Sequence, residues 1–203
     1  METYRPTNER KIPTKQGIYS FFINSITLEK VGLLGSGPFS DAQLITAKNN
    51  LLLKAEKMAE LTKLNTLKGK LIEVNKENTG VKLDILGYED LPKGLLGLIS
   101  GCKLNHVYSL VELISATGLY NRPIYVGITK KQTLQGRYYQ HKSDFMSMTN
   151  KESFGKRVRT LGFDWDDIIF SCTPFLHSSS QISVLNELEK YMMFMSKPFL
   201  SIK

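Results

Sequence analysis

The stretch Pro123-Ile124-Tyr125-Val126-Gly127-Ile128-Thr129 decides how the second half of this 203-residue chain folds. Its β-branched and aromatic residues are typical of a buried strand. Because side chains alternate along a strand, Tyr125 faces the side opposite to its apolar neighbours. A strand tyrosine usually packs with its hydroxyl at the rim. Taken alone, Tyr125 therefore indicates a structural residue.

The run before this strand is ambiguous. Residues 107–114 read Val-Tyr-Ser-Leu-Val-Glu-Leu-Ile, a composition that favours either a strand or a short helix. The turn-forming residues Thr117, Gly118 and Asn121 separate it from the strand at 123–129. An antiparallel hairpin is the economical interpretation, and it would place Tyr108 beside Tyr125.

A helical face with an arginine and a histidine follows the strand. The pattern predicts a helix over 132–146, on which Leu134, Arg137, Tyr138 and His141 share one face at spacings of three and four. A guanidinium beside an imidazole suits an anionic ligand, because arginine is always charged and offers a fixed fork of donors. The alternative is a surface helix with a structural arginine.

The end of the chain predicts a third strand over 167–172 and a helix over 182–196 that stops before Pro198. Glu189 falls at the edge of the apolar stripe of this helix, which is formed by Ile182, Leu185, Leu188 and Met192. A carboxylate in such a position costs free energy unless it is paired or bound to a metal. Glu189 is therefore either ion-paired or a metal ligand.

The first hundred residues predict a separate small domain. Residues 1–15 are a polar arm, ordered only if docked, and 18–23 is a buried strand. A capping box at Ser40–Gln43 begins a helix that reaches about residue 64, and 71–75 with 81–86 form a hairpin. The helix carries Lys48, Lys54, Lys57 and Lys63, which form either a solvated face or a phosphate-contacting one.

The overall composition favours a polyanionic partner. There are 27 Lys and Arg against 19 Asp and Glu, a net charge of +8 and a pI near 9.4. Cys102 and Cys172 have neither disulfide-framework nor metal-site spacing, so we expect reduced thiols in a cytoplasmic protein. The sequence shows neither a signal peptide nor an apolar run of membrane-spanning length, so we expect no membrane partner.

The joint pattern resembles the GIY-YIG nuclease family over roughly residues 104–203. It consists of Val107-Tyr108, Tyr125-Val126-Gly127, Leu134-x-x-Arg137-x-x-x-His141, and Glu189 nine residues before Pro198. The resemblance implies an α+β fold, with a small three-stranded antiparallel sheet flanked by helices. A separate N-terminal α+β domain would precede it.

The resemblance also implies the roles of the site residues. Tyr108 would be the first signature tyrosine, acting as a general base or orienting water, and Tyr125 would be the second. Arg137 would stabilise phosphate charge, with His141 as a hydrogen-bonding or proton-carrying neighbour. Glu189 would bind one Mg²⁺ or Mn²⁺. Further phosphate contacts would come from Lys130, Lys54 and Lys57.

Two departures from the family pattern and one misplaced match stand out. His106 occupies the position of the first signature glycine, and Ser201 stands where the family often has asparagine. Gly17-Ile18-Tyr19 spells the first signature literally, yet it lies more than a hundred residues before Tyr125. Since the family's two signature strands are normally neighbours in a hairpin, we interpret this match as accidental.

These observations predict an arm at 1–15, an N-terminal domain at 16–103 and a nuclease domain at 104–203. The N-terminal domain is a natural surface for target recognition or dimerisation. We expect a restriction-type endonuclease acting on double-stranded DNA, with a homodimer or sequential nicking needed to cut both strands. The alternatives are a structure-selective repair, phage or mobile-element nuclease, and a catalytically silent nucleic-acid-binding module.

Overall fold

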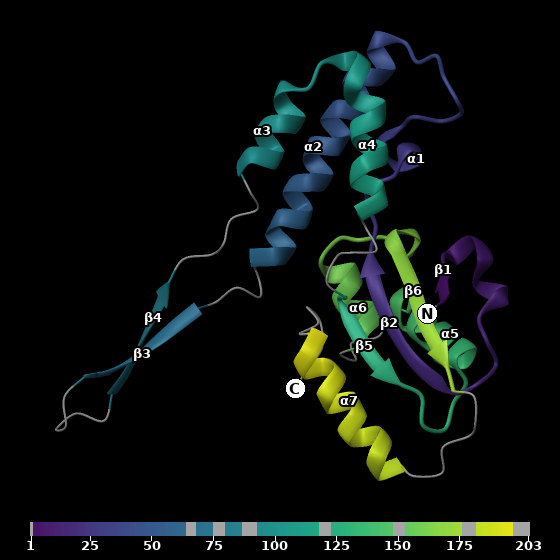
Figure 1. The fold of residues 1–203 in the computed structure, drawn as a ribbon, viewed down its shortest axis with the longest axis vertical. Helices are drawn as coiled ribbons and strands as arrows, with labels where there is room; N and C mark the ends of the chain where they lie inside the picture. The colour runs from purple at the N-terminus through teal and green to yellow at the C-terminus, as the bar shows by residue number, and fades with distance from the viewer. Residues whose placement is uncertain are drawn as a thin grey trace. The chain divides into compact units, whose positions relative to one another are not determined.

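Two compact units make up the chain in the computed structural model, which describes residues 2–63, 68–74, 80–86, 93–117, 123–147, 153–175 and 182–196. Unit 1 comprises Met1–Thr27 together with Glu112–Lys203, and unit 2 comprises Leu28–Val111 (Figure 1). Unit 2 is therefore an insertion in unit 1. The expected boundary between 16–103 and 104–203 does not match this division, because the first strand of the sheet belongs with the C-terminal half.

Unit 1 is built on a four-stranded antiparallel open sheet in the order β1-β6-β2-β5. The strands are β1 (Glu2–Tyr4), β2 (Gly17–Ile23), β5 (Tyr125–Ile128) and β6 (Ile168–Pro174). The α+β class and three of these strands are as expected. The expected number of three strands is wrong, because β1 of the N-terminal arm adds an edge strand along β6, with Thr3 opposite Ser171.

The expected hairpin of 107–114 with 123–129 is also wrong. Residues Val107–Ala116 form helix α4, and the strand that pairs with β5 is β2. Val107 and Val111, four residues apart, are fully buried, whereas Leu113 is exposed. Burial therefore follows the helical period, and the β-branched composition alone does not decide the conformation.

The core of unit 1 is aromatic and centres on Phe21 of β2, which is completely buried. Its ring lies 4.7 Å from that of Phe154 and 5.1 Å from that of Phe170, measured between centroids. Phe154 opens α6 (Phe154–Thr160), and α5 (Leu134–Met146) contributes Tyr138 to the same face. Helices α5 and α6 thus cover the sheet face on which Phe21 lies.

Gly155 lets α6 approach α5 more closely than any other residue would allow. A Cβ at this position would collide with the backbone nitrogen of Phe145 and lie 2.7 Å from the carbonyl oxygen of His141. These atoms belong to the helix backbone and have little freedom to move. The helix that carries His141 is consequently held against α6.

The N-terminal arm is docked on unit 1. Its 3₁₀ helix η1 (Pro6–Lys11) places Glu9 within 3.0 Å of the Tyr138 hydroxyl and 2.7 Å of Lys142 Nζ. The Tyr138 oxygen also accepts a hydrogen bond from the indole of Trp165 at 3.0 Å. These bonds satisfy polar groups at the edge of the core. They also dock the arm on unit 1, which is the condition under which we expected it to be ordered.

Helix α7 (Ile182–Ser196) completes unit 1 and packs along β5. Its Leu185 is buried, which confirms this position of the expected apolar stripe. Among the described helices of both units, none combines the length and the apolar character needed to cross a bilayer.

Within the described residues, unit 2 contains three whole α-helices, the first half of α4 and a hairpin. The whole helices are α1 (Leu28–Val31), α2 (Asp41–Lys63) and α3 (Lys93–Gly101), and the short η2 (Leu104–His106) precedes α4. The predicted capping box is confirmed, because the Ser40 backbone donates to Gln43 Oε1 at 2.9 Å. Strands β3 (Lys68–Val74) and β4 (Gly80–Leu86) pair as a two-stranded hairpin. Of the turn expected at 76–80, residues 76–79 lie outside the described residues.

We predict that Gly155→Ala lowers the free energy of unfolding of unit 1 by roughly 1–3 kcal/mol, because the added methyl group overpacks the α5–α6 contact. The control is Gly94→Ala in α3, where an added Cβ meets nothing within 4 Å. Urea unfolding followed by fluorescence of the single tryptophan, Trp165, reports unit 1 directly. Equal midpoints for the two variants would contradict the close-packing argument.

Candidate active site

Two tyrosines lie on neighbouring strands and on the same face of the sheet. In the register of β2 with β5, Tyr19 is opposite Gly127 and Phe21 is opposite Tyr125. Directly opposed residues of an antiparallel pair share a face, so Tyr19 and Tyr125 are diagonal neighbours. Their rings are 6.0 Å apart and nearly parallel, with an interplanar angle of 25°.

The tyrosine beside Tyr125 is therefore Tyr19, which corrects the assignment of Tyr108. Tyr108 lies on helix α4, where its ring stacks on that of Phe39 at 5.7 Å within unit 2. The reason for interpreting Gly17-Ile18-Tyr19 as accidental, that its strand would not be a neighbour of the strand of Tyr125, is wrong, since this segment forms the strand that pairs with β5. The two strands are paired although unit 2 is inserted between them in the sequence.

Gly127 provides the space that the Tyr19 ring occupies. A Cβ at Gly127 would lie 2.6 Å from the Tyr19 hydroxyl oxygen and 2.7 Å from the adjacent ring carbon. Any residue other than glycine would displace the phenol from the sheet. The glycine of Tyr125-Val126-Gly127 is thus explained by the position of Tyr19.

Arg137 and His141 converge on the Tyr19 hydroxyl from helix α5. Arg137 Nε donates a hydrogen bond to this oxygen at 3.1 Å, and His141 Nε2 lies 3.3 Å from it. The helix begins at the N-cap Thr133, whose side chain accepts from the Gly136 backbone. One turn later Arg137 faces the sheet, and His141 follows at i+4, so the spacing seen in the sequence produces this convergence.

Burial keeps Tyr19 protonated. Desolvation raises its pKa well above that of an ordinary tyrosine, and Tyr125 adds to the rise, whereas Arg137 opposes it. The ring is 1% exposed, so water cannot stabilise a phenolate. In this state the Tyr19 hydroxyl orients neighbouring groups and is a poor general base.

His141 is neutral for the same reason. Burial, together with the positive charges of Arg137 and Arg157, lowers its pKa to about 3. Its Nδ1 has no hydrogen-bond partner within the described part of the chain. Because orphaned N–H groups are rarer in proteins than under-satisfied acceptors, we assign the proton to Nε2, which then donates to Tyr19.

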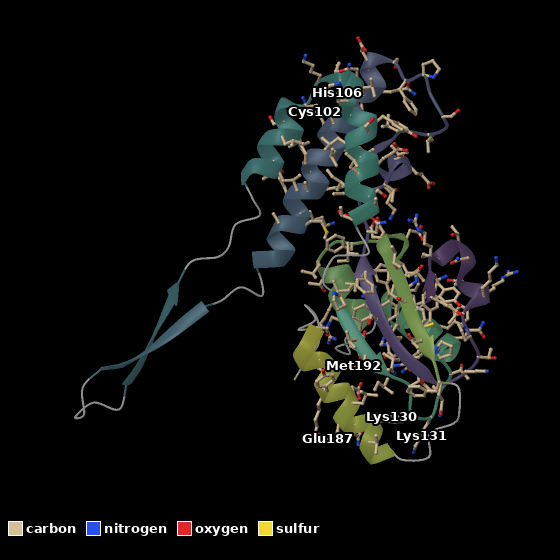
Figure 2. All side chains as sticks on the ribbon, viewed as in Figure 1. Cys102, His106, Lys130, Lys131, Glu187 and Met192 are labelled. Atoms are coloured by element: carbon tan, nitrogen blue, oxygen red, sulfur yellow. The ribbon has the colours of Figure 1, made fainter. Side chains whose placement is uncertain are left out.

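Glu189 lies on α7 and forms an ion pair with Lys130, the second residue after β5. The distance between Lys130 Nζ and Glu189 Oε2 is 2.7 Å, and both side chains are about one quarter exposed. Figure 2 labels Lys130 and Lys131 at this end of the sheet, near α7. Lys130 and Glu189 were both expected to contact ligands, and the structure pairs them in unit 1.

The surroundings of Glu189 fit a cation that is held by few protein atoms. No group of three or more His, Cys, Asp or Glu side chains gathers anywhere in the described ranges. Glu189 instead borders an open hollow together with Asn186, Glu187, Lys190 and Met193. Mg²⁺ keeps several waters and takes one or two carboxylates plus substrate phosphate, so one carboxylate at an open position fits it.

Lys54 and Lys57, the other expected phosphate contacts, lie on α2 of unit 2, and both are half-exposed. The structure therefore divides the expected site residues into two groups. Tyr125, Arg137, His141, Glu189 and Lys130 belong to unit 1, whereas Lys54 and Lys57 belong to unit 2 together with Tyr108. Tyr19, which the sequence argument rejected, lies beside Tyr125, Arg137 and His141, and its Gly-Ile-Tyr context was the sequence signal that pointed to it.

We predict that protein stability falls as the pH drops from about 6.5 towards 3, in part because of His141. The unfolded histidine takes up a proton near its ordinary pKa of about 6.5, whereas the folded one does so only near 3. The unfolded state then binds more protons, so acid favours unfolding. His141→Gln keeps a hydrogen-bond donor and should make the slope shallower by up to about 1.4 kcal/mol per pH unit. Urea titrations between pH 4 and 6 measure the difference, and identical slopes would contradict it.

Comparisons with protein-family models, with curated protein sequences and with solved structures found no match for this chain.

Proposed function

We propose that unit 1 is a metal-dependent endonuclease of the GIY-YIG type that hydrolyses DNA phosphodiester bonds. The observation that carries this proposal is the convergence of Tyr19, Tyr125, Arg137 and His141 on one sheet face. The resemblance supplied Tyr125, Arg137 and His141 from the sequence. Tyr19 completes the set with the literal first signature.

The chemistry of these groups supports phosphoryl chemistry. Arg137 is about half-buried and keeps its positive charge, because Tyr19 and Tyr125 raise its pKa although desolvation opposes them. A guanidinium fixed in this way offers preorganised charge where negative charge grows in the transition state. The half-buried Tyr125 orients the attacking water or a phosphate oxygen through its hydroxyl, and the buried Tyr19 positions Arg137. A divalent ion at Glu189 would supply charge neutralisation at the scissile phosphate.

The distribution of charge supports a polyanionic partner for unit 1. Unit 1 has 16 Lys and Arg against 10 Asp and Glu, a net charge of +6, whereas unit 2 has 11 against 9, a net charge of +2. Unit 1, which contains Tyr19 and Tyr125, thus carries most of the net positive charge of the chain. Such a field raises the association rate with nucleic acid. Target recognition or dimerisation remains our proposed role for unit 2.

Incubation of the purified protein with long duplex DNA and Mg²⁺ or Mn²⁺ tests the proposal. Discrete fragments would support a sequence-specific restriction-type enzyme, whose double-strand cut requires a homodimer or two successive nicks. Cleavage of flaps or nicked duplexes, with intact duplex untouched, would support a structure-selective repair, phage or mobile-element nuclease instead. The location in the cell that fits this function is the cytoplasm, where phage DNA or chromosomal DNA is met.

A second candidate is a catalytically silent nucleic-acid-binding module. The observation in its favour is the ion pair of Lys130 with Glu189, because a lysine here already neutralises the one carboxylate proposed to bind metal. Retained DNA affinity with no product in either divalent ion would decide for this candidate.

We predict that Tyr19→Phe lowers the cleavage rate by about 10²-fold or more, since it removes a hydroxyl positioned by Arg137 and His141. Tyr108→Phe is the matched control and should change the rate by less than about twofold, because Tyr108 packs on Phe39 in unit 2. Single-turnover cleavage of one duplex measures both. A large loss of cleavage rate in Tyr108→Phe with no loss in Tyr19→Phe would show that Tyr108, and not Tyr19, is the first signature tyrosine.

We predict that Glu189→Ala abolishes metal-dependent cleavage, while folding and DNA binding persist, because the side chain is partly exposed and lies at the unit surface. Its control is Glu187→Ala, which removes an exposed carboxylate paired with Lys190 on the same helix. Cleavage across a Mn²⁺ titration, together with circular dichroism of both variants, measures the outcome. Full activity of Glu189→Ala would remove this residue from the mechanism.

A further inference from the structure

The backbone around Lys130 is fixed to the start of the strand that carries Tyr19. Thr129 accepts a hydrogen bond from the Gly17 backbone at 2.7 Å and donates its own backbone N–H to Gly17 at 2.9 Å. The Gln16 side chain donates to the Lys130 carbonyl oxygen at 2.7 Å. The backbone of Lys130 therefore has a set position beside Gln16, the residue before β2.

The Lys130 side chain itself has room to move. It is 29% exposed and ends on Glu189, which is 59 residues away in sequence. A lysine ammonium is a compact charge on a flexible four-carbon stem, so it changes position at small cost. A partly exposed ion pair of this kind contributes little to stability, typically about 0–1 kcal/mol. The pair is consequently easy to exchange.

A divalent cation and the Lys130 ammonium compete for the same carboxylate. With a cation on Glu189, the ammonium at 2.7 Å from Oε2 would face a like charge at close range. The nearby carboxylate of Glu187 is already bound to Lys190, and Glu9 is bound to Lys142. A displaced Lys130 therefore gains most by turning towards an added anion.

We propose that Lys130 is an exchangeable counter-cation, which holds Glu189 until a divalent ion binds and then contacts a phosphate of the nucleic acid. This proposal rests on the proposed function for the identity of the anion. In this proposal Lys130 has two positions. Binding of the metal raises the affinity for the polynucleotide, and binding of the polynucleotide raises the affinity for the metal. Lys131 provides a matched control, because this adjacent exposed lysine has no carboxylate partner in the described part of the chain.

The first test measures affinity for a labelled duplex in EDTA, with the full-length protein. Glu189→Gln frees Lys130 and should tighten binding by roughly 3–10-fold. This gain in duplex affinity should be absent from the double variant that combines Glu189→Gln with Lys130→Met. It should be present in the double variant that combines Glu189→Gln with Lys131→Met. A gain that survives Lys130→Met would come from loss of the carboxylate charge alone and would overturn the proposal.

The second test measures Mn²⁺ binding by electron paramagnetic resonance, without nucleic acid. Lys130→Met should raise the Mn²⁺ affinity by several-fold, Lys131→Met should leave it unchanged, and Glu189→Gln should abolish it. Lys130→Gln is a second variant should Lys130→Met fold poorly. An unchanged or weaker Mn²⁺ affinity in both Lys130 variants would overturn the exchange.

The two proposals fail in different ways. Absence of cleavage by the wild-type protein, with the Mn²⁺ and duplex results as expected, would refute the nuclease and leave the exchange at Lys130 supported. Normal cleavage by the wild-type protein, together with a Mn²⁺ affinity that is the same in the Lys130 variants, would refute the exchange and leave the nuclease supported.

Discussion

The antiparallel pairing of β2 with β5 is the contact on which the candidate site depends. It sets Tyr19 opposite Gly127 and diagonal to Tyr125, and the bare Cα of Gly127 is what allows the phenol to lie against the sheet. Once the ring is in this position, helix α5 needs only its ordinary i, i+4 spacing to direct Arg137 and His141 at the same oxygen. A single register thus determines which four polar side chains meet.

Burial then determines the chemical state of these side chains. Tyr19 stays protonated and His141 stays neutral, because neither has enough contact with water to stabilise its charged form. Arg137 is the charged member of the group. The cluster is therefore an electropositive patch with two oriented phenols, and α6 holds it in place through Phe154 and Gly155. Such an arrangement suits the binding of a phosphate more than the removal of a proton by a phenolate.

The ion pair of Lys130 with Glu189 has a different character. Lys130 and Glu189 are partly exposed and come from a loop and a helix that are remote in sequence. The ion pair between these two side chains is a weak interaction. The short hydrogen bonds are those that hold Thr129 and Lys130 against Gly17 and Gln16. The rigid part of the site therefore positions the groups, whereas the ion pair is free to respond to ligands.

Local pattern was enough to predict the strands at Gly17–Ile23 and Tyr125–Ile128 to within two residues at each end, the face shared by Arg137 and His141, and the capping box at Ser40. These features follow from periodicity and from contacts within a few residues. The partner of Tyr125 was decided by tertiary structure alone. A strand pairs with whichever edge the whole chain presents to it, and the insertion of Leu28–Val111 separates β2 from β5 in sequence while leaving them adjacent in space. The helical state of Val107–Ala116 was likewise decided by burial of Val107 and Val111, because its composition is compatible with either conformation.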